Sequence, residues 1–339
     1  MLKQITNKFQ FPIPKDWKLV ILIFMICLGF SISFLGFVPS AHAQTLSLSV
    51  SPPLTEVMII PGKSVSQTFT FINEGQDGMA KIYIIPFTAE DESGNVELDE
   101  KNIITASSPF ASWFSIISPV SSFGEKFYMA GGARQDVTIK INPSAGAKEK
   151  DYYFTVMFEL ENTATTGVAG SGSTNVARIG ANLLISLSED GNPEKKLEIL
   201  EFTAPKVIDS LGKLDFNIRI ANQESYFSKP NGQITIKPMF GNPEVLQLAP
   251  LNVISNSVRN IPCLKNEETV RCEAENKVLV GIYKSTLEIS ADGESPSIQK
   301  TITTIAFPFS IIFVLIFVLM TYKIIKNAKN KAGKPLDNA

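Results

Sequence analysis

Residue types that commonly carry chemistry are sparse in this chain of 339 residues. Its only histidine, His42, lies at the end of an apolar N-terminal segment that we expect to be removed. A mature chain without histidine cannot run a Ser-His-Asp or Cys-His reaction and cannot hold a histidine-ligated zinc ion. Carboxylate chemistry or a Ser-Lys pair stays open, but the sequence singles out no pair for either. We therefore predict that the protein is not an enzyme and needs no cofactor.

The densest group of carboxylates lies in DESGNVELDE, residues 91–100. Carboxylate oxygens at this density could bind calcium, but their spacing does not match an EF-hand loop. A solvated acidic loop is the simpler interpretation, and we predict no metal site. The acidic residues of this segment are Asp91, Glu92, Glu97, Asp99 and Glu100.

The cysteines predict a disulfide. Cys27 lies in the N-terminal segment, which leaves Cys263 and Cys272 as the only pair of the mature chain. An even pair in an exported domain favours a disulfide, which would close a loop of about ten residues and contribute roughly 2.5–3 kcal/mol. Two free thiols are the alternative, and a zinc site would need more ligands than two cysteines.

The N-terminus reads as an export signal over residues 1–43. A lysine-bearing start precedes an almost uncharged run from Leu19 to Val38, and Ala41-His42-Ala43 follows. A basic start, an apolar centre and a small-x-small site are typical of a signal peptide, cut here after Ala43. The apolar run is longer than the usual ~7–15 residues, so an uncleaved anchor stays an alternative.

The C-terminus predicts a transmembrane helix over residues 304–322, with a lysine-rich tail over residues 323–339. Ile305–Tyr322 is an uncharged apolar run whose helical length would be roughly 27 Å, close to the thickness of the hydrocarbon core. The lysines that follow place the tail in the cytoplasm by the positive-inside rule. We expect a single-pass protein of the cell membrane with an extracytoplasmic N-terminal ectodomain. The residues expected to anchor the cytoplasmic end are Lys323, Lys326, Lys329 and Lys331.

Between these ends, apolar and polar residues alternate with the period of a β-strand. Val137, Ile139 and Ile141 alternate with polar residues, and similar runs occur at 65–71, 152–160, 214–220 and 283–289. Such strands, separated by turns rich in glycine, proline and asparagine, are typical of antiparallel sandwiches. We predict an all-β fold of two tandem Ig-like sandwiches. The membrane-distal one covers residues 44–194 and the membrane-proximal one residues 195–303, and residues 163–174 form a flexible hairpin tip.

The motif order is similar to one known family. In the first half, PPLTEVMIIPGKSVSQTFTFINEG is followed by SPFASWFSIISP, INPSAGAKEKDYYFTVMFE and ARIGANLLISL. The second half contains FNIRIANQESYFSKPNGQITI and then VGIYKSTLEIS. Together these motifs resemble the WxL-interacting cell-surface proteins and related bacterial Ig-like surface proteins. The resemblance implies that the first domain binds peptidoglycan.

Two functions follow as hypotheses. The first is binding of cell-wall glycan or of another surface protein, for which the candidate contacts are Phe110, Trp113 and Phe114 if their rings are exposed. A sandwich usually buries such a tryptophan, so core packing is the alternative for Trp113. The second is a chaperone-like envelope assembly factor that offers an uncovered strand edge to an extended client. A net charge of −2, dispersed basic residues and the lack of a phosphate-binding loop motif exclude a nucleic-acid or nucleotide partner. The oligomeric state stays open.

Overall fold

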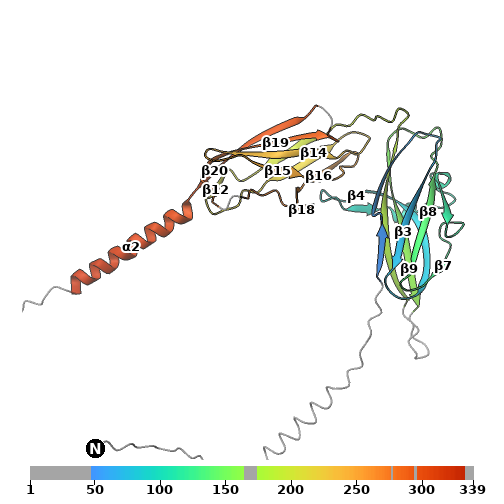
Figure 1. Ribbon diagram of the computed structural model, residues 1–339, viewed down its shortest axis with the longest axis horizontal. Coiled ribbons are helices and arrows are strands. Elements are labelled where there is room, and N and C mark those ends of the chain that lie inside the picture. Colours follow the sequence, from blue (N-terminus) through green and yellow to red (C-terminus); the bar gives the residue numbers. More distant parts are fainter. Residues whose placement is uncertain (1–46, 164–173, 276–277, 294–295, 333–339) are drawn as a thin grey trace, which may run out of the picture. The chain divides into compact units, whose positions relative to one another are not determined.

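A computed structural model describes residues 47–163, 174–275, 278–293 and 296–332 (Figure 1). Both groups of strands and the C-terminal helix belong to one unit of the chain, which begins at Leu46. The predicted signal peptide, residues 1–43, lies outside the described residues. So do residues 164–173 of the predicted hairpin tip.

The first sandwich consists of two sheets. Its smaller sheet has the order β1-β3-β8-β6, with β1 Leu48–Ser51, β3 Val65–Asn73, β8 Arg134–Ile141 and β6 Phe114–Ser118. Its larger sheet has the order β2-β10-β9-β4-β5, and β7 also pairs with β4. The strands of the larger sheet are β2 Leu54–Ile59, β10 Thr174–Leu187, β9 Asp151–Thr163, β4 Gly78–Ala89, β5 Val96–Leu98 and β7 Phe127–Met129. Two short 3-10 turns, η1 Glu100–Asn102 and η2 Ala111–Trp113, precede β6.

The second sandwich repeats the plan. Its smaller sheet has the order β11-β13-β16, with β11 Glu198–Thr203, β13 Asn217–Asn222 and β16 Ser257–Asn260. Its larger sheet has the order β12-β20-β19-β14-β15-β17-β18. These strands are β12 Val207–Asp209, β20 Ile298–Phe307, β19 Gly281–Ala291, β14 Pro230–Pro238, β15 Glu244–Leu248, β17 Cys263–Lys265 and β18 Glu268–Val270. The predicted all-β, Ig-like fold is confirmed.

The alternation in the sequence builds a separate core for each sandwich. In the first, Val137, Ile139 and Ile141 are fully buried, and Phe71 of one sheet stacks on Phe158 of the other with ring centroids 4.7 Å apart. Burying a side chain of this size contributes about 1.5–3 kcal/mol. In the second core, Phe202, Phe216, Ile218 and Ile220 play the same part.

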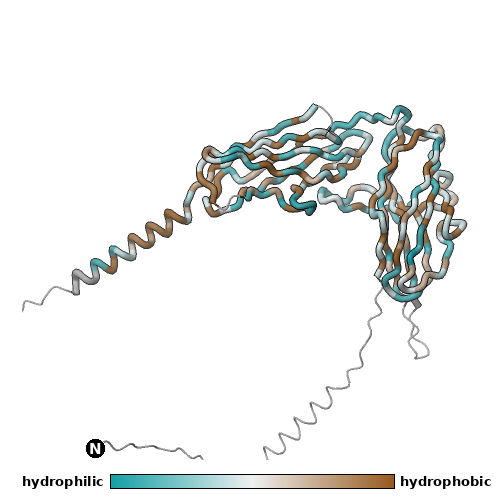
Figure 2. The backbone as a smooth tube through the Cα atoms, viewed as in Figure 1, coloured by the Kyte–Doolittle hydropathy of each residue, from teal (hydrophilic) through white to brown (hydrophobic). Residues whose placement is uncertain are grey.

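One helix follows the strands. Helix α2 covers Phe309–Ala332, and its stretch Phe309–Asn327 is long and apolar enough to cross a membrane, with a mean hydropathy of 2.1 (Figure 2). The apolar run predicted as helix from Ile305 begins instead as the end of β20, because Ile305 pairs with Val207 and Ile282. Pro308 separates strand from helix, since proline has no N–H for the ladder and is tolerated in the first helical turn.

Candidate functional site

The three candidate aromatic rings pack in the first core. Trp113 is 5% exposed and Phe114 is 6% exposed. Phe110 is half-buried and meets Trp113 edge-on, with ring centroids 5.0 Å apart. Tyr152 also packs edge-on against Trp113, with ring centroids 4.8 Å apart. The structure therefore assigns these rings to the core, and they do not form a platform for a sugar. The reason is that η2 turns Trp113 inward just before β6 begins.

The acidic segment makes contacts within the protein. The carboxylate of Asp91 accepts hydrogen bonds from Ser93 and Asn95 and so closes its own turn. Glu92 instead pairs with Arg219 of the second sandwich. In the described part of the chain, no group of three or more histidine, cysteine or acidic side chains is arranged to hold a metal ion.

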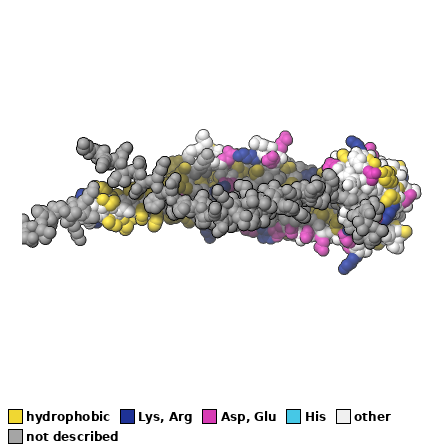
Figure 3. Space-filling model, turned by 90° about the horizontal axis from the view of Figure 1, so that it is seen from below, with side chains coloured by type: hydrophobic (Ala, Val, Ile, Leu, Met, Phe, Trp, Pro, Cys, Tyr) yellow, Lys and Arg dark blue, Asp and Glu magenta, His cyan; other side chains and the backbone are white. Residues whose placement is uncertain are grey.

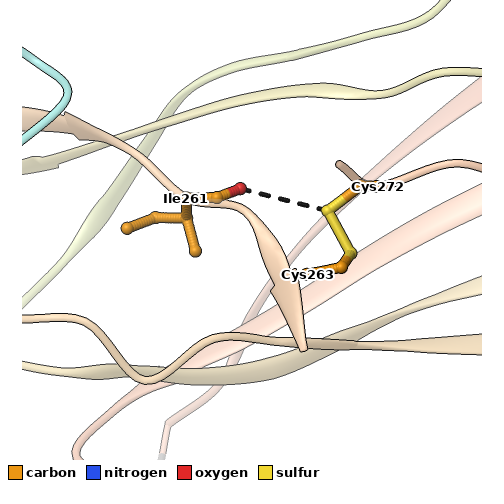
Figure 4. Close-up of a disulfide and its surroundings, with 3 residues drawn as sticks. All are labelled: Ile261, Cys263 and Cys272. Atoms are coloured by element: carbon orange, nitrogen blue, oxygen red, sulfur yellow. Dashed lines mark hydrogen bonds between the residues drawn. A yellow bond between two sulfur atoms is a disulfide. The ribbon is translucent and has the colours of Figure 1, made fainter. Parts of the chain in front are cut away.

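The predicted disulfide is confirmed. Cys263 and Cys272 are bonded, and both side chains are 3% exposed (Figure 4). The bond ties β17 to the segment after β18 and leaves the carbonyl oxygen of Ile261 4.0 Å from Sγ of Cys272. This is a van der Waals contact, because a disulfide sulfur carries no proton to donate.

Charged side chains of both signs are mixed on the surface. On the face shown in Figure 3, basic and acidic side chains are interspersed, and hydrophobic ones gather along the helix. Lys323 and Lys326 lie exposed on α2 just beyond its most apolar part. The side chains of Lys329 and Lys331 lie outside the described residues.

Two outer strand edges of the first sandwich are blocked. The outer edge of β4 is covered because the carbonyls of Ile82, Ile84 and Pro86 accept backbone hydrogen bonds from later loops. Strand β6 is short, has a register shift between Ile116 and Ser118, and is followed by Pro119. Irregularity and proline are common ways in which proteins block edges.

Strand β10 is paired on both sides along only part of its length. Its C-terminal half, Asn182–Leu187, pairs with both β9 and β2, whereas its N-terminal half, Thr174–Ala181, pairs only with β9 among the described strands. The N–H of Asn182 donates to the carbonyl of Pro53 at 2.9 Å, on the β2 side. Backbone groups alternate sides along a strand, and the β9–β10 register has no shift. The N–H and C=O groups of Val176, Arg178 and Gly180 therefore point to the side of β10 on which no described strand pairs with this half.

The edge is unpaired because the N-terminal segment passes from the smaller sheet to the larger sheet at Pro52-Pro53. Strand β1 pairs antiparallel with β3 in the smaller sheet, and β2 then pairs parallel with β10 in the larger one. Strand β1 lies beside β10 but does not pair with it. The two sheets are therefore left unjoined along the N-terminal half of β10. We call the backbone edge of Val176–Gly180 the open edge.

A network of charged side chains links β10 to β9 and β4 at the level of the open edge. Glu159 on β9 is 2% exposed, and its carboxylate is held by Arg178 at 2.6 Å, Lys81 at 2.5 Å and the Tyr83 hydroxyl at 2.9 Å. Burial favours a raised pKa for Glu159, but these hydrogen bonds outweigh it and hold the pKa below its ordinary value. Arg178 is half exposed and also approaches Glu100 at 3.3 Å. These contacts tie β10 to its neighbours β9 and β4.

A second feature is a cavity of about 640 Å³ lined by residues of both sandwiches. Its charged side chains are paired with one another. Lys229 meets Glu56 at 2.7 Å, and Lys195 meets Asp292. The four charged side chains that line the cavity are therefore compensated by one another.

Sequence reasoning predicted the strand of the open edge but not its exposure. The alternation in ARIGANLLISL marks β10, yet nothing local shows how far a neighbour covers it. The only sequence signal for an unpaired edge was a difference in length between the segments that form β2 and β10. The apolar run before Pro61 is short, whereas the alternating segment that ends at Leu187 is longer.

Comparisons with known proteins find similarity only in structure. No protein-family model and no curated protein matches the sequence. The chain is similar to one in the complex of the Salmonella enterica SafA pilin with the SafB chaperone, with 12% identity and a TM-score of 0.36, covering 77% of this chain and 98% of the other. It is also similar to the E. coli chaperone DraB, with 12% identity, a TM-score of 0.33, and 76% and 99% covered. The class 5 fimbriae chaperone CfaA gives 12% identity, a TM-score of 0.34, and 78% and 100% covered.

The predicted family was wrong. The solved structures found to be similar include several fimbrial chaperones and a PapD-like domain of human CEP192, rather than WxL-interacting proteins. The motifs behind that prediction are Pro-Gly turns and strands that end in asparagine. Such turn chemistry serves Ig-like sandwiches in general, so its order does not separate one family from another.

Proposed function

We propose that this protein is a non-catalytic envelope assembly factor, anchored in a membrane by α2, that holds an extended segment of another surface protein on the open edge. The observation that carries the proposal is the one-sided pairing of Thr174–Ala181. An unpaired edge of this length is a template for an added strand, which natural proteins otherwise block. The outer edges of β4 and β6 are blocked, whereas this one is unpaired among the described strands.

The chemistry of the edge suits a peptide backbone. Val176, Arg178 and Gly180 offer donors and acceptors at every second residue, the spacing that an extended segment matches. Main-chain hydrogen bonds of this kind provide affinity for many sequences, and alternate side chains provide selectivity. Val176 is 48% exposed and would supply apolar contact, while Arg178 would supply charge.

The anchor supports a role beside a membrane. Phe309–Asn327 has the composition of a span, and Lys323 and Lys326 lie near its end. We infer that both sandwiches are extracytoplasmic and that the lysine-rich tail is cytoplasmic. Glycan binding is the weaker alternative because, of the rings nominated for it, Trp113 and Phe114 are buried and Phe110 is half-buried.

A proline substitution tests the open edge. The full chain in nanodiscs would be probed with a synthetic array of 12-residue peptides that tile the exported proteins of the same genome. Val176→Pro removes one donor of the open edge, and Val176→Thr is the matched control that keeps it. We expect peptides with alternating apolar residues to bind wild type and the threonine variant alike. The proline variant should bind them about tenfold more weakly, since a lost hydrogen bond is worth roughly 1 kcal/mol and proline also disturbs the alignment.

The proposal fails if the array yields no binding peptide, or if the proline variant binds as well as wild type. A circular dichroism spectrum unchanged by Val176→Pro is needed alongside, because it shows that lost binding does not come from unfolding.

A further inference from the structure

Exposed apolar side chains gather at one end of the second sandwich. Six of them are between 46% and 73% exposed, although they come from four separate segments of the chain. We call them the apolar rim: Leu211, Met239, Phe240, Val278, Val280 and Phe307.

The strand register brings these segments to the same end. Gly281 pairs with Ala306, which places the start of β19 beside the end of β20. The N–H of Met239 donates to Ile282 at 2.8 Å, and the N–H of Leu279 donates to Ser210 at 2.8 Å. The β14–β15 turn, the start of β19, the turn after β12 and the end of β20 therefore lie next to one another.

The rim is also tied to the first turn of α2. The N–H of Ser210 donates to the carbonyl of Phe307 at 3.1 Å. The carboxylate of Asp209 accepts hydrogen bonds from the N–H groups of Ser310 at 2.7 Å and Leu211 at 2.9 Å. The rings of Phe307 and Phe309 lie 5.0 Å apart. The sandwich end and the helix start are thus joined by several contacts as well as by the chain.

Lengths then place the rim relative to a membrane. The 19 residues Phe309–Asn327 form a helix roughly 28 Å long, close to the ~30 Å hydrocarbon core. The hydrocarbon boundary therefore falls near Phe309. The two residues before it reach at most ~7 Å, and the headgroup layer on each side is about 5–7 Å thick.

We propose that the apolar rim lies in the interfacial layer of the membrane that α2 crosses, so that the second sandwich rests on the lipid surface. This inference depends on the membrane anchoring proposed above. Aromatic and long apolar side chains are favourable at the headgroup level. Exposed lysines above the rim, Lys206, Lys237 and Lys284, are placed to meet lipid phosphates. The carboxylate of Asp209, which lies beside the rim, already accepts hydrogen bonds from the N–H groups of Ser310 and Leu211.

Depth measurements with spin labels test the inference. In the full chain with Cys27→Ser, reconstituted into phosphatidylcholine and phosphatidylglycerol vesicles, single labels would be placed through Phe240→Cys, Val245→Cys and Ile316→Cys. Val245 is the matched control, because it is 48% exposed, apolar and on the same hairpin, but lies higher on the ladder, opposite Thr235. We expect the label at 240 to be several-fold less accessible to a water-soluble nickel complex than the label at 245.

The label at 316 separates two kinds of failure. If it is accessible to nickel, α2 is not in the bilayer and the anchoring proposal is wrong. If 316 is protected while 240 is as accessible as 245, the anchor stands and the rim inference is overturned. Dipolar broadening between labels at 240 would assign the rim to a second copy of the chain and would also overturn it. Leu211→Cys provides a second rim position should Phe240→Cys not fold.

Discussion

Glu92 and Arg219 form a two-pronged ion pair that joins the two sandwiches. Nε of Arg219 donates to one carboxylate oxygen of Glu92 at 2.7 Å, and a terminal guanidinium nitrogen donates to the other. Beside the pair, the N–H of Asn260 donates to the backbone carbonyl of Glu92 at 2.7 Å. The turn between β4 and β5, predicted as a solvated acidic loop, therefore attaches the first sandwich to the second. Hydrogen bonds from Arg219 hold the pKa of Glu92 below its usual range.

Removing this carboxylate should loosen the attachment without unfolding either sandwich. We expect Glu92→Ala to raise the hydrogen-exchange rate of the Asn260 amide several-fold, because its acceptor is positioned by the ion pair. High salt should produce a weaker version of the same effect in wild type. Glu97→Ala, on an exposed neighbouring position of β5, is the control. An Asn260 amide that exchanges equally fast in both variants would contradict the role of the pair.

Asp151 should make stability depend on pH. It is 4% exposed and accepts hydrogen bonds from Ser186, Tyr153 and the N–H of Phe227. Burial raises the pKa of Asp151 above 3.8, although these hydrogen bonds oppose the shift. The folded chain then holds this proton more tightly than the unfolded chain. The protonated Asp151 therefore stabilises the folded chain below about pH 4, and this stabilisation is lost as the pH rises through the pKa of Asp151 in the folded state.

Asp151→Asn separates charge from hydrogen bonding. The asparagine amide can accept hydrogen bonds from Phe227 and Tyr153 and can donate one to Ser186. We therefore expect these three contacts to persist in the variant. The fall in unfolding free energy from pH 4 to 7 should shrink by about 1.4 kcal/mol per unit of pKa shift. Asp151→Ala should instead cost about 1–3 kcal/mol for each donor left unpaired. Denaturant unfolding followed by Trp113 fluorescence measures both, and equal pH slopes in wild type and Asp151→Asn would refute the assignment.

The disulfide should stabilise the second sandwich only. Replacing Cys263 and Cys272 together by alanine should lower its unfolding free energy by roughly 2.5–3 kcal/mol, because the open loop gains entropy in the unfolded chain. Hydrogen exchange of buried β19 amides such as that of Leu287 reports this loss. Trp113 in the first sandwich provides an internal control, and its unfolding midpoint should move little. Unchanged protection at Leu287 would show that the bond contributes nothing.

Two neighbouring prolines should behave differently in β10. The N–H of Val176 points to the open edge, whereas that of Ala177 points toward Leu160 on β9. We expect Val176→Pro to change the melting temperature little. Ala177→Pro should destabilise the first sandwich by about 3 kcal/mol, because it removes a ladder hydrogen bond in the middle of a sheet. Equal destabilisation by the two would mean that the N–H of Val176 does not face the open edge.

The sequence by itself determined the features that depend on local patterns. The alternation in DVTIKI could only bury one face of a strand, the pair Cys263 and Cys272 had no other partner in the mature chain, and the apolar run after Pro308 could only form an apolar helix. Only the tertiary structure decided that Trp113 faces the core, that Glu92 meets Arg219, and that β2 covers β10 no farther than Asn182. Each of these depends on contacts between segments far apart in the chain, and residue type and spacing do not encode how two such segments align. The open edge, on which the proposed function rests, belongs to that second group.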